Sequence, residues 1–329
     1  MFQPQFVDVD DVLLHVETAG PEDGPPVLFL HGWPDLWLSF DRQMTALAAQ
    51  GYRVLAPDQR GYGLSSKPTA VADYAMPNLT KDIALLIERQ ELAPVHLVGH
   101  DWGAAVAWTL ATERPDLVRS LTVVNCPHPQ VLAEALMRRP SQMLRSWYML
   151  AFQIPGLAEA VLGARDHAVL TAMLRHGAGL DDADLERHRA VWRHPGTVQR
   201  PLFWYRAMFR TMLASIRAER SAARNARTSA RAGSSSAHDP SGRGSSEHGA
   251  RASERGARSR REPLVRVPTQ IIWGGRDGAF SRSLAEPSAA MCEQAVLHRL
   301  DARHWPHREQ PGRVTGLLTS WFARHADLP

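Results

Sequence analysis

The chain has 329 residues, of which 44% are hydrophobic, so it can bury a large core and is neither fibrous nor largely disordered. Its formal net charge of +4 is unevenly spread, because residues 214–262 hold eleven Arg against five Asp or Glu. The rest of the chain is mildly acidic, which argues against a basic nucleic-acid-binding fold. Cys126 and Cys292 lack C-x-x-C spacing, so neither a disulfide framework nor a zinc site is expected, and a reducing compartment fits best.

The first twenty residues, MFQPQFVDVDDVLLHVETAG, mix acidic residues with short apolar pairs. This pattern predicts a strand hairpin and lacks the basic and apolar regions of a signal peptide. No uninterrupted apolar run reaches the roughly 18 residues that a membrane-spanning helix needs. We therefore expect a cytoplasmic protein without membrane insertion.

Short β-rich runs alternate with amphipathic stretches from Val27 onward. The apolar spacing predicts strands at 26–30, 52–56, 95–98 and 121–125, and helices at 79–92 and 104–112. Such alternation predicts an α/β fold with a mostly parallel central sheet and helices on both faces. Residues 131–213 show helical spacing, and the next predicted strands lie at 269–273 and 296–300, so an all-helical insertion interrupts the sheet.

Residues 214–262 consist mainly of Arg, Ser, Ala and Gly, with one large aliphatic residue, Ile216, and no aromatic residue. Such a composition buries too little apolar area to offset chain entropy, and it predicts a disordered insertion. The first part, to about residue 231, is also compatible with a continuation of the preceding helix. An arm that binds nucleic acid is the less favoured alternative.

The strongest local signal is VHLVGHDWGAA, residues 95–105, in which an apolar strand runs through G-x-D-x-G into a small-residue helix. This is the nucleophile-elbow pattern with Asp101 in place of serine. The alternative is that Asp101 simply caps the helix that follows it. Further motifs favour the elbow.

Those motifs supply the partners that a nucleophile needs. His31-Gly32-Trp33-Pro34 follows an apolar strand, where hydrolases place an oxyanion loop, so the backbone amides of Trp33 and Trp102 are predicted to form the oxyanion hole. Asp277 follows the strand at 269–273, and His304 follows the strand at 296–300. This gives the expected chain order of nucleophile, acid and histidine.

Five segments, HGWPD, DQRGYGLSSKP, GHDWGAAVAW, WGGRD and RHWPHREQP, resemble the α/β-hydrolase-fold family of epoxide hydrolases and haloalkane dehalogenases. The resemblance implies an α/β-hydrolase core over residues 1–130 and 263–329 and a helical cap over 131–213. It also implies that Asp101 is the nucleophile, His304 the base and Asp277 the acid that orients it. No cofactor and no metal are expected.

The cap separates epoxide from halide chemistry, because an opening epoxide needs an acid and a tyrosine supplies one without a charge. Tyr148 and Tyr205 lie in segments similar to the two cap tyrosine motifs of epoxide hydrolases. We therefore predict hydrolysis of a small apolar or aromatic epoxide by water, giving a vicinal diol through an ester on Asp101. Five tryptophans are expected to line the cap or pocket, or to pack in the core: Trp37, Trp147, Trp192, Trp204 and Trp305.

Two alternatives remain open. A haloalkane dehalogenase would use the same Asp101, His304 and Asp277, although Trp33 stands where many dehalogenases carry Asn. A non-catalytic scaffold that binds a ligand or partner is the second. The sequence also leaves open a homodimer, and the consequence of Arg303, which replaces the family's usual Gly and is expected either to alter its loop or to reach toward the pocket.

Overall fold

The computed structural model describes residues 2–234 and 265–326. The chain divides into two compact units, Met1–Ala207 with Leu264–Pro329, and Met208–Pro263. The first unit contains the sheet and every residue of the predicted site. The second contains the greater part of one long helix.

Within the described residues, eight strands form one sheet in the order β1-β2-β4-β3-β5-β6-β7-β8. They are β1 (Gln3–Asp8), β2 (Leu13–Ala19), β3 (Pro26–Leu30), β4 (Arg53–Pro57), β5 (Val95–His100), β6 (Val118–Val124), β7 (Thr269–Gly274) and β8 (Ala295–Leu300). β2 pairs antiparallel with β1 and β4, and the strands from β4 to β8 pair in parallel. The predicted hairpin and mostly parallel sheet are confirmed.

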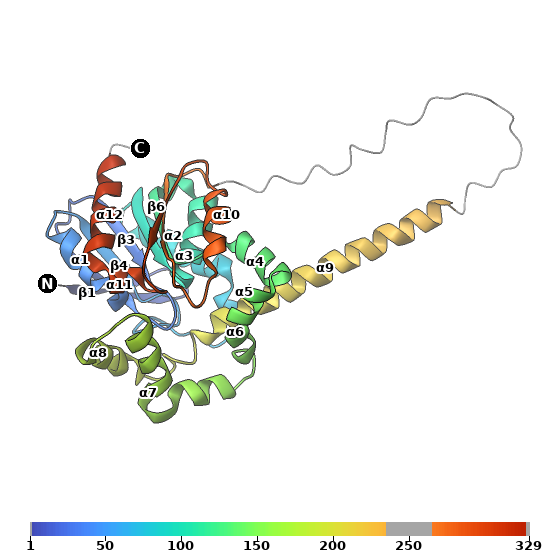
Figure 1. Ribbon diagram of the computed structural model, residues 1–329, viewed down its shortest axis with the longest axis horizontal. Helices are drawn as coiled ribbons and strands as arrows, with labels where there is room; N and C mark the ends of the chain where they lie inside the picture. Colours follow the sequence, from blue (N-terminus) through green and yellow to red (C-terminus); the bar gives the residue numbers. More distant parts are fainter. Residues whose placement is uncertain (1, 235–264, 327–329) are drawn as a thin grey trace, which may run out of the picture. The chain divides into compact units, whose positions relative to one another are not determined.

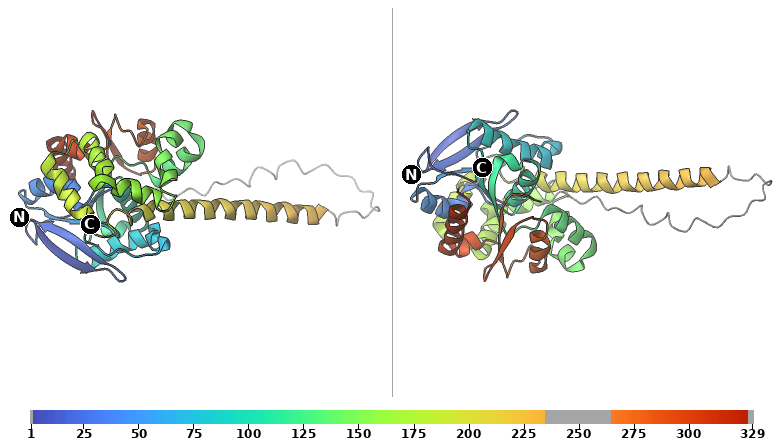
Figure 2. Two further views of the ribbon diagram at one scale, coloured as in Figure 1. Left: turned by 90° about the horizontal axis from the view of Figure 1, so that it is seen from below. Right: turned by 90° about the horizontal axis from the view of Figure 1, so that it is seen from above.

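Helices cover both faces of this sheet (Figure 1), and Figure 2 shows α12 and α2 on opposite sides of it. The helices of the sheet region are α1 (Asp41–Ala48), α2 (Met76–Arg89), α3 (Trp102–Glu113), α10 (Ala285–Ala289), α11 (Pro306–Glu309) and α12 (Pro311–Arg324). Phe29 of β3 and Phe40 before α1 pack with ring centroids 4.9 Å apart. Leu318 and Phe322 of α12 join the same buried cluster, so α1 and α12 close one side of the core.

The described chain between β6 and β7 contains helices and no named strand, as the spacing at 131–213 predicts. These helices are α4 (Pro129–Arg138), α5 (Pro140–Arg145), α6 (Trp147–Ala151), α7 (Leu157–Gly177), α8 (Asp182–Trp192) and α9 (Leu202–Ser234). α9 continues past residue 213 to Ser234, which matches the helical alternative for the start of the Arg-rich segment rather than disorder there. The expected disorder of residues 235–262 lies outside the described residues.

Among residues 2–234 and 265–326, every helix falls short of the length or apolar character needed to cross a membrane.

Candidate active site

Asp101 lies at the sharp turn between β5 and α3 and has a backbone φ of 49° and ψ of −119°. Two neighbouring glycines make this turn sterically feasible. A Cβ at Gly103 would lie 2.2 Å from the Leu30 carbonyl oxygen, and one at Gly99 would lie 2.6 Å from the Ala104 Cα. The turn therefore combines positive φ with close backbone approach, as a strained elbow does.

The side chain of Asp101 makes no capping hydrogen bond to α3. Instead the Trp33 backbone N–H donates to its Oδ1 at 3.0 Å. Burial raises the pKa of this carboxyl, but the hydrogen bond and charge of His304, with the Trp33 amide, lower it below its ordinary value overall. The capping alternative is wrong, and the carboxylate is ionised at neutral pH.

His304 lies between two carboxylates. Its Nδ1 is 2.9 Å from Asp277 Oδ2, and its Nε2 is 3.5 Å from Asp101 Oδ2. Burial alone lowers the pKa of the imidazole, but the charges of Asp277 and Asp101 outweigh burial and raise it to about 10. The histidine in the resting site is therefore an imidazolium held between two negative groups.

Asp277 is fixed by the loop after β7 and by a residue that the sequence analysis did not single out. The backbone N–H groups of Ala279 and Phe280 donate to Oδ1 at 2.7 and 3.2 Å, and Asn125 Nδ2 donates to Oδ2 at 2.8 Å. Asn125 Oδ1 accepts from the Gly274 N–H at 2.6 Å. The sequence could have indicated Asn125, because it is a polar residue directly after β6, the strand that pairs with β7 before Asp277.

The loop that carries His304 is tied down on both sides. His100 Nε2 donates to the His304 carbonyl at 2.9 Å, and burial first, then the His304 charge, lower the pKa of His100 to about 4. Arg303 turns to Glu309, whose carboxylate accepts from the Arg303 backbone N–H at 2.7 Å and from its Nε at 3.1 Å. The expectation that Arg303 reaches toward the pocket is therefore wrong.

Aromatic rings enclose the open side of Asp101. The Tyr205 ring lies 5.0 Å from the rings of Trp102 and Phe152 and 6.1 Å from that of Tyr148, centroid to centroid. Trp33 contacts Phe152 at 5.0 Å and Tyr205 at 5.9 Å. Burial raises the pKa of both tyrosines, and the Asp101 charge adds to it, so both hydroxyls keep their protons at neutral pH.

A buried contact joins the loop after β3, which bears Trp33, to α8, and no sequence motif pointed to it. Asp35, two residues after Trp33, has its Oδ1 2.7 Å from His188 Nε2, and Ser39 Oγ donates to its Oδ2 at 2.7 Å. Burial raises the pKa of Asp35, but hydrogen bonding and the charge of His188 lower it well below its usual range. Asp35 therefore holds the loop that bears the Trp33 amide.

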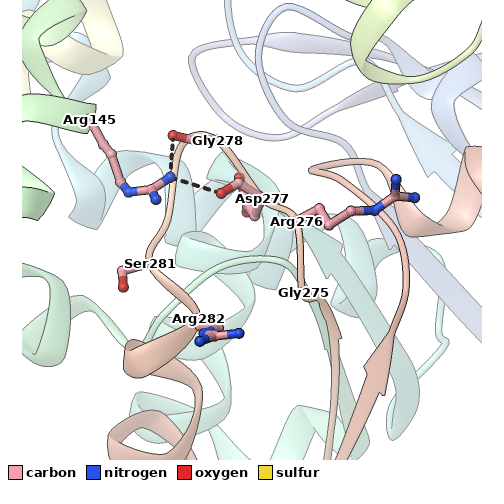
Figure 3. Close-up of a pocket in the computed structure, with 7 residues that line it drawn as sticks. All are labelled: Arg145, Gly275, Arg276, Asp277, Gly278, Ser281 and Arg282. Atoms are coloured by element: carbon pink, nitrogen blue, oxygen red, sulfur yellow. Dashed lines mark hydrogen bonds between the residues drawn. The ribbon is translucent and has the colours of Figure 1, made fainter.

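Two hollows lie near the site. A small one of about 10 Å³ is bordered by apolar and aromatic side chains that include Trp33, Tyr62 and Trp192, and it is smaller than a bound substrate. A larger one of about 460 Å³ lies on the outer side of the Asp277 loop (Figure 3), and Asp101 is not among the residues that line it. Asp101 itself is buried, with 7% of its surface exposed.

Known proteins are similar to this chain over most of its length. The family profile described as "alpha/beta hydrolase fold" matches residues 25–311. The chain is 33% identical to AB hydrolase superfamily protein YfhM of Bacillus subtilis, over 97% of each chain, and 28% identical to Epoxide hydrolase 4 of Homo sapiens, over 94% of this chain and 75% of that one. A crystal structure of an epoxide hydrolase of Bacillus megaterium superposes with a TM-score of 0.76 at 26% identity, covering 97% of this chain and all of that one.

Proposed function

Because the chain belongs to the α/β-hydrolase fold family, we propose that its site hydrolyses small apolar or aromatic epoxides to vicinal diols through an ester on Asp101. The observation that carries this proposal is an ionised Asp101 facing two protonated tyrosines, Tyr148 and Tyr205, with the His304–Asp277 pair on its other side. The kinship with named epoxide hydrolases supports the choice of substrate.

In the first step the Asp101 carboxylate attacks an epoxide carbon. Oδ1 is held by the Trp33 amide, which leaves Oδ2 as the attacking oxygen. The carbon–oxygen bond of the ring breaks, and Tyr148 or Tyr205 gives its proton to the departing oxygen, which becomes a hydroxyl of the same molecule. The product of this step is an ester on Asp101 and one tyrosinate.

In the second step water attacks the ester carbonyl while His304 takes its proton. The carbonyl oxygen is then Oδ1, so the Trp33 amide, and by the elbow geometry that of Trp102, stabilises the tetrahedral oxyanion. Collapse breaks the ester carbon–oxygen bond, the proton of the added hydroxyl passes to the departing diol oxygen, and the Asp101 carboxylate is regenerated beside an imidazolium that keeps the proton taken from water. Asp277 stabilises this imidazolium.

Charge explains why His304 acts in the second step and not in the first. Ester formation removes the negative charge of Asp101, which is one of the groups that raise the pKa of His304. The pKa of the imidazole therefore falls when the ester forms, and the histidine gives its proton to the tyrosinate, which restores the tyrosine and frees the ring to act as a base. Asp277 remains to orient the ring.

These roles correspond to two parts of the chain, a core and a cap. Residues 1–130 and 263–329 form the hydrolase core, and residues 131–213 form a cap whose Tyr148 and Tyr205 face the nucleophile. We place the protein in the cytoplasm.

A single turnover in ¹⁸O-labelled water tests the covalent step. The enzyme, in excess over styrene oxide, is digested after reaction, and the peptide that contains Asp101 is weighed by mass spectrometry. We expect one ¹⁸O in the Asp101 carboxylate. Diol without label would refute the ester, and a lack of diol with any epoxide would favour a non-catalytic binding protein.

The tyrosines distinguish an epoxide hydrolase from a haloalkane dehalogenase. The double variant Tyr148→Phe/Tyr205→Phe should lose epoxide turnover, because no acid remains for the alkoxide. Tyr52→Phe is the matched control, since Tyr52 packs against Phe322 away from the site. Halide release from a haloalkane that survives the double substitution, together with unchanged epoxide turnover, would contradict the proposal.

A further inference from the structure

Large apolar side chains are exposed along one continuous stretch of the helical region. Leu144 is 75% exposed and Trp147 is 65% exposed, although Trp147 is one of the tryptophans expected in the pocket or core. The spacing of the exposed residues of α5 and α6 is helical. We call the set the apolar strip, which comprises Met143, Leu144, Trp147, Leu150, Ile154 and Leu157.

The opposite side of the same helices is buried against the catalytic acid loop. Gln142 Nε2 donates to the Ala279 carbonyl at 2.8 Å, and its Oε1 accepts from the Ser281 N–H at 3.0 Å. Tyr148, on α6, lies among the aromatic rings over Asp101. The apolar strip is therefore the outer surface of a segment whose inner surface borders the site.

Positive charge surrounds the strip. Residues 135–158 contain three arginines and no Asp or Glu. Arg138 pairs with Glu134 at 3.3 Å, which leaves Arg139 and Arg145 without a carboxylate partner among the described residues. Arg145 Nη1 donates to the carbonyls of Asp277 at 2.9 Å and Gly278 at 3.1 Å, so its guanidinium is fixed at the edge of the larger hollow (Figure 3).

The hollow itself suits an anion. Its volume is about 460 Å³, comparable to small-molecule pockets in proteins, and its lining includes Arg145, Arg276 and Arg282. Asp277 also lines it, but the carboxylate of Asp277 is engaged by His304 and Asn125. Arg276 is paired with Asp301 through Nε at 2.8 Å, and Figure 3 shows its guanidinium pointing away from that of Arg145. Arg145 and Arg282 are thus the two cations best placed for a phosphate group.

We propose that the apolar strip and this basic hollow together dock the protein on the surface of a membrane that contains anionic phospholipids. Trp, Leu and Met side chains enter the boundary between headgroups and acyl chains, as amphipathic membrane-surface helices do, while the arginines bind headgroup phosphates. Docking brings the site to the phase in which apolar epoxides concentrate. This last consequence depends on the proposed function, whereas vesicle binding does not.

The charge distribution favours a membrane over the other occupants of such a surface. A symmetric contact with a second copy would bring Arg139 and Arg145 of both chains together, and neither has a carboxylate partner on its own helix. The Arg-rich segment 214–262 has only Ile216 as a large aliphatic residue and no aromatic one, so it offers no apolar face for the strip.

Vesicle flotation with the full chain tests the proposal. Vesicles of phosphatidylcholine alone are compared with vesicles that also contain phosphatidylglycerol, at low and high salt. We expect binding to the anionic vesicles that weakens with salt. The variant Leu144→Ser/Trp147→Ser/Leu150→Ser should bind at least about tenfold more weakly, since burial of apolar area drives such binding.

Two further variants make the result specific. Leu13→Ser/Leu64→Ser alters leucines that are 44% and 45% exposed on β2 and on the loop after β4, and it should bind as the unmodified protein does. Arg282→Glu should weaken binding to anionic vesicles by about fivefold or more and leave the weak binding to neutral vesicles unchanged. Because Arg282 lies outside α5 and α6, this variant still tests the proposal if the triple variant unfolds.

The outcomes are separable. No binding of the unmodified protein to either vesicle, or binding unaffected by the triple variant and by Arg282→Glu, would overturn the proposal. So would a triple variant that turns a dimer into a monomer, because the strip would then be an interface between copies. Turnover of dissolved styrene oxide should be unchanged in the triple variant, so failure of the docking proposal and failure of the proposed function give different results.

Discussion

Asn125 offers the sharpest test of how the acid is held. Replacement by glycine removes three side-chain bonds, to Asp277, to the Gly274 N–H and to the Arg303 carbonyl, but keeps a residue that tolerates the positive φ of 43° at this position. Asn125 does not touch the reacting atoms in the proposed mechanism. It is a positioning residue, and its loss should slow the step in which His304 acts.

The magnitude follows from one bond. Asn125 Nδ2 donates to the Asp277 carboxylate at 2.8 Å, in a buried setting. A hydrogen bond to a charged group contributes about 1.5–3 kcal/mol. If that stabilisation of the His304–Asp277 pair is lost in the hydrolysis step, the rate constant for ester hydrolysis falls about 10- to 150-fold, since about 1.4 kcal/mol corresponds to tenfold. Formation of the ester should be nearly unaffected.

The kinetic signature is a fall of kcat and KM together with an unchanged kcat/KM, because the ester accumulates. Stopped-flow single turnovers with styrene oxide measure both steps, and urea unfolding reports any loss of stability. Asn125→Asp is the companion variant, and it should be slower still because two carboxylates would then compete for one site. A drop in kcat/KM without ester accumulation would contradict the positioning role.

Three further predictions concern titration, the base loop and the core. The rate constant of ester hydrolysis should rise with pH as His304 loses its proton, with a midpoint below the pKa of about 10 that His304 has in the resting site. Single turnovers from about pH 5 to about pH 10 measure this midpoint, and a midpoint at or above that pKa would refute the charge argument. Glu309→Ala removes the acceptor of the Arg303 N–H and should slow the same step about two- to tenfold. Glu309→Gln should slow it less, because its amide oxygen still accepts from that N–H, and equal effects of the two variants in stopped-flow turnovers would contradict this. Phe40→Ala should lower the free energy of unfolding by about 3–5 kcal/mol, because the ring is fully buried against Phe29. Urea unfolding measures this change, and a loss of less than about 1 kcal/mol would contradict the prediction and show that the core repacks.

The centre of the sheet was predictable because its strands, unlike the edge strands β1 and β8, are buried along most of their length and appear in the sequence as apolar runs. β3, β5 and β7 lie within one or two residues of their predicted bounds. Helix starts were less accurate: α2 begins at Met76, three residues before the predicted start, because Pro77 is accommodated in a first helical turn and carries no apolar signal. Apolar periodicity indicates the buried face of a helix, but it gives no indication of a first turn that is polar or contains proline.

The predicted site residues meet in space because each follows a strand of one parallel sheet. Asp101, Asp277 and His304 come after β5, β7 and β8, and the carboxyl ends of parallel strands lie at one edge. The supporting residues were not found by motif. His188 pairs with Asp35 from 153 positions away, and no local pattern encodes such a contact.

The loop after β7 connects the chemistry of the site to the outer surface. The side chain of Asp277 faces inward to His304, whereas its backbone carbonyl faces outward and accepts from Arg145 on α5. Gln142, one helical turn earlier, holds the same loop through Ala279. Since these helices bear the apolar strip on their other side, a shift of the strip is transmitted directly to the Asp277 loop by the side chains of Gln142 and Arg145. Docking and the orientation of Asp277 therefore depend on one short segment, whose loop-facing side carries the polar Gln142 and Arg145 and whose outward side is apolar.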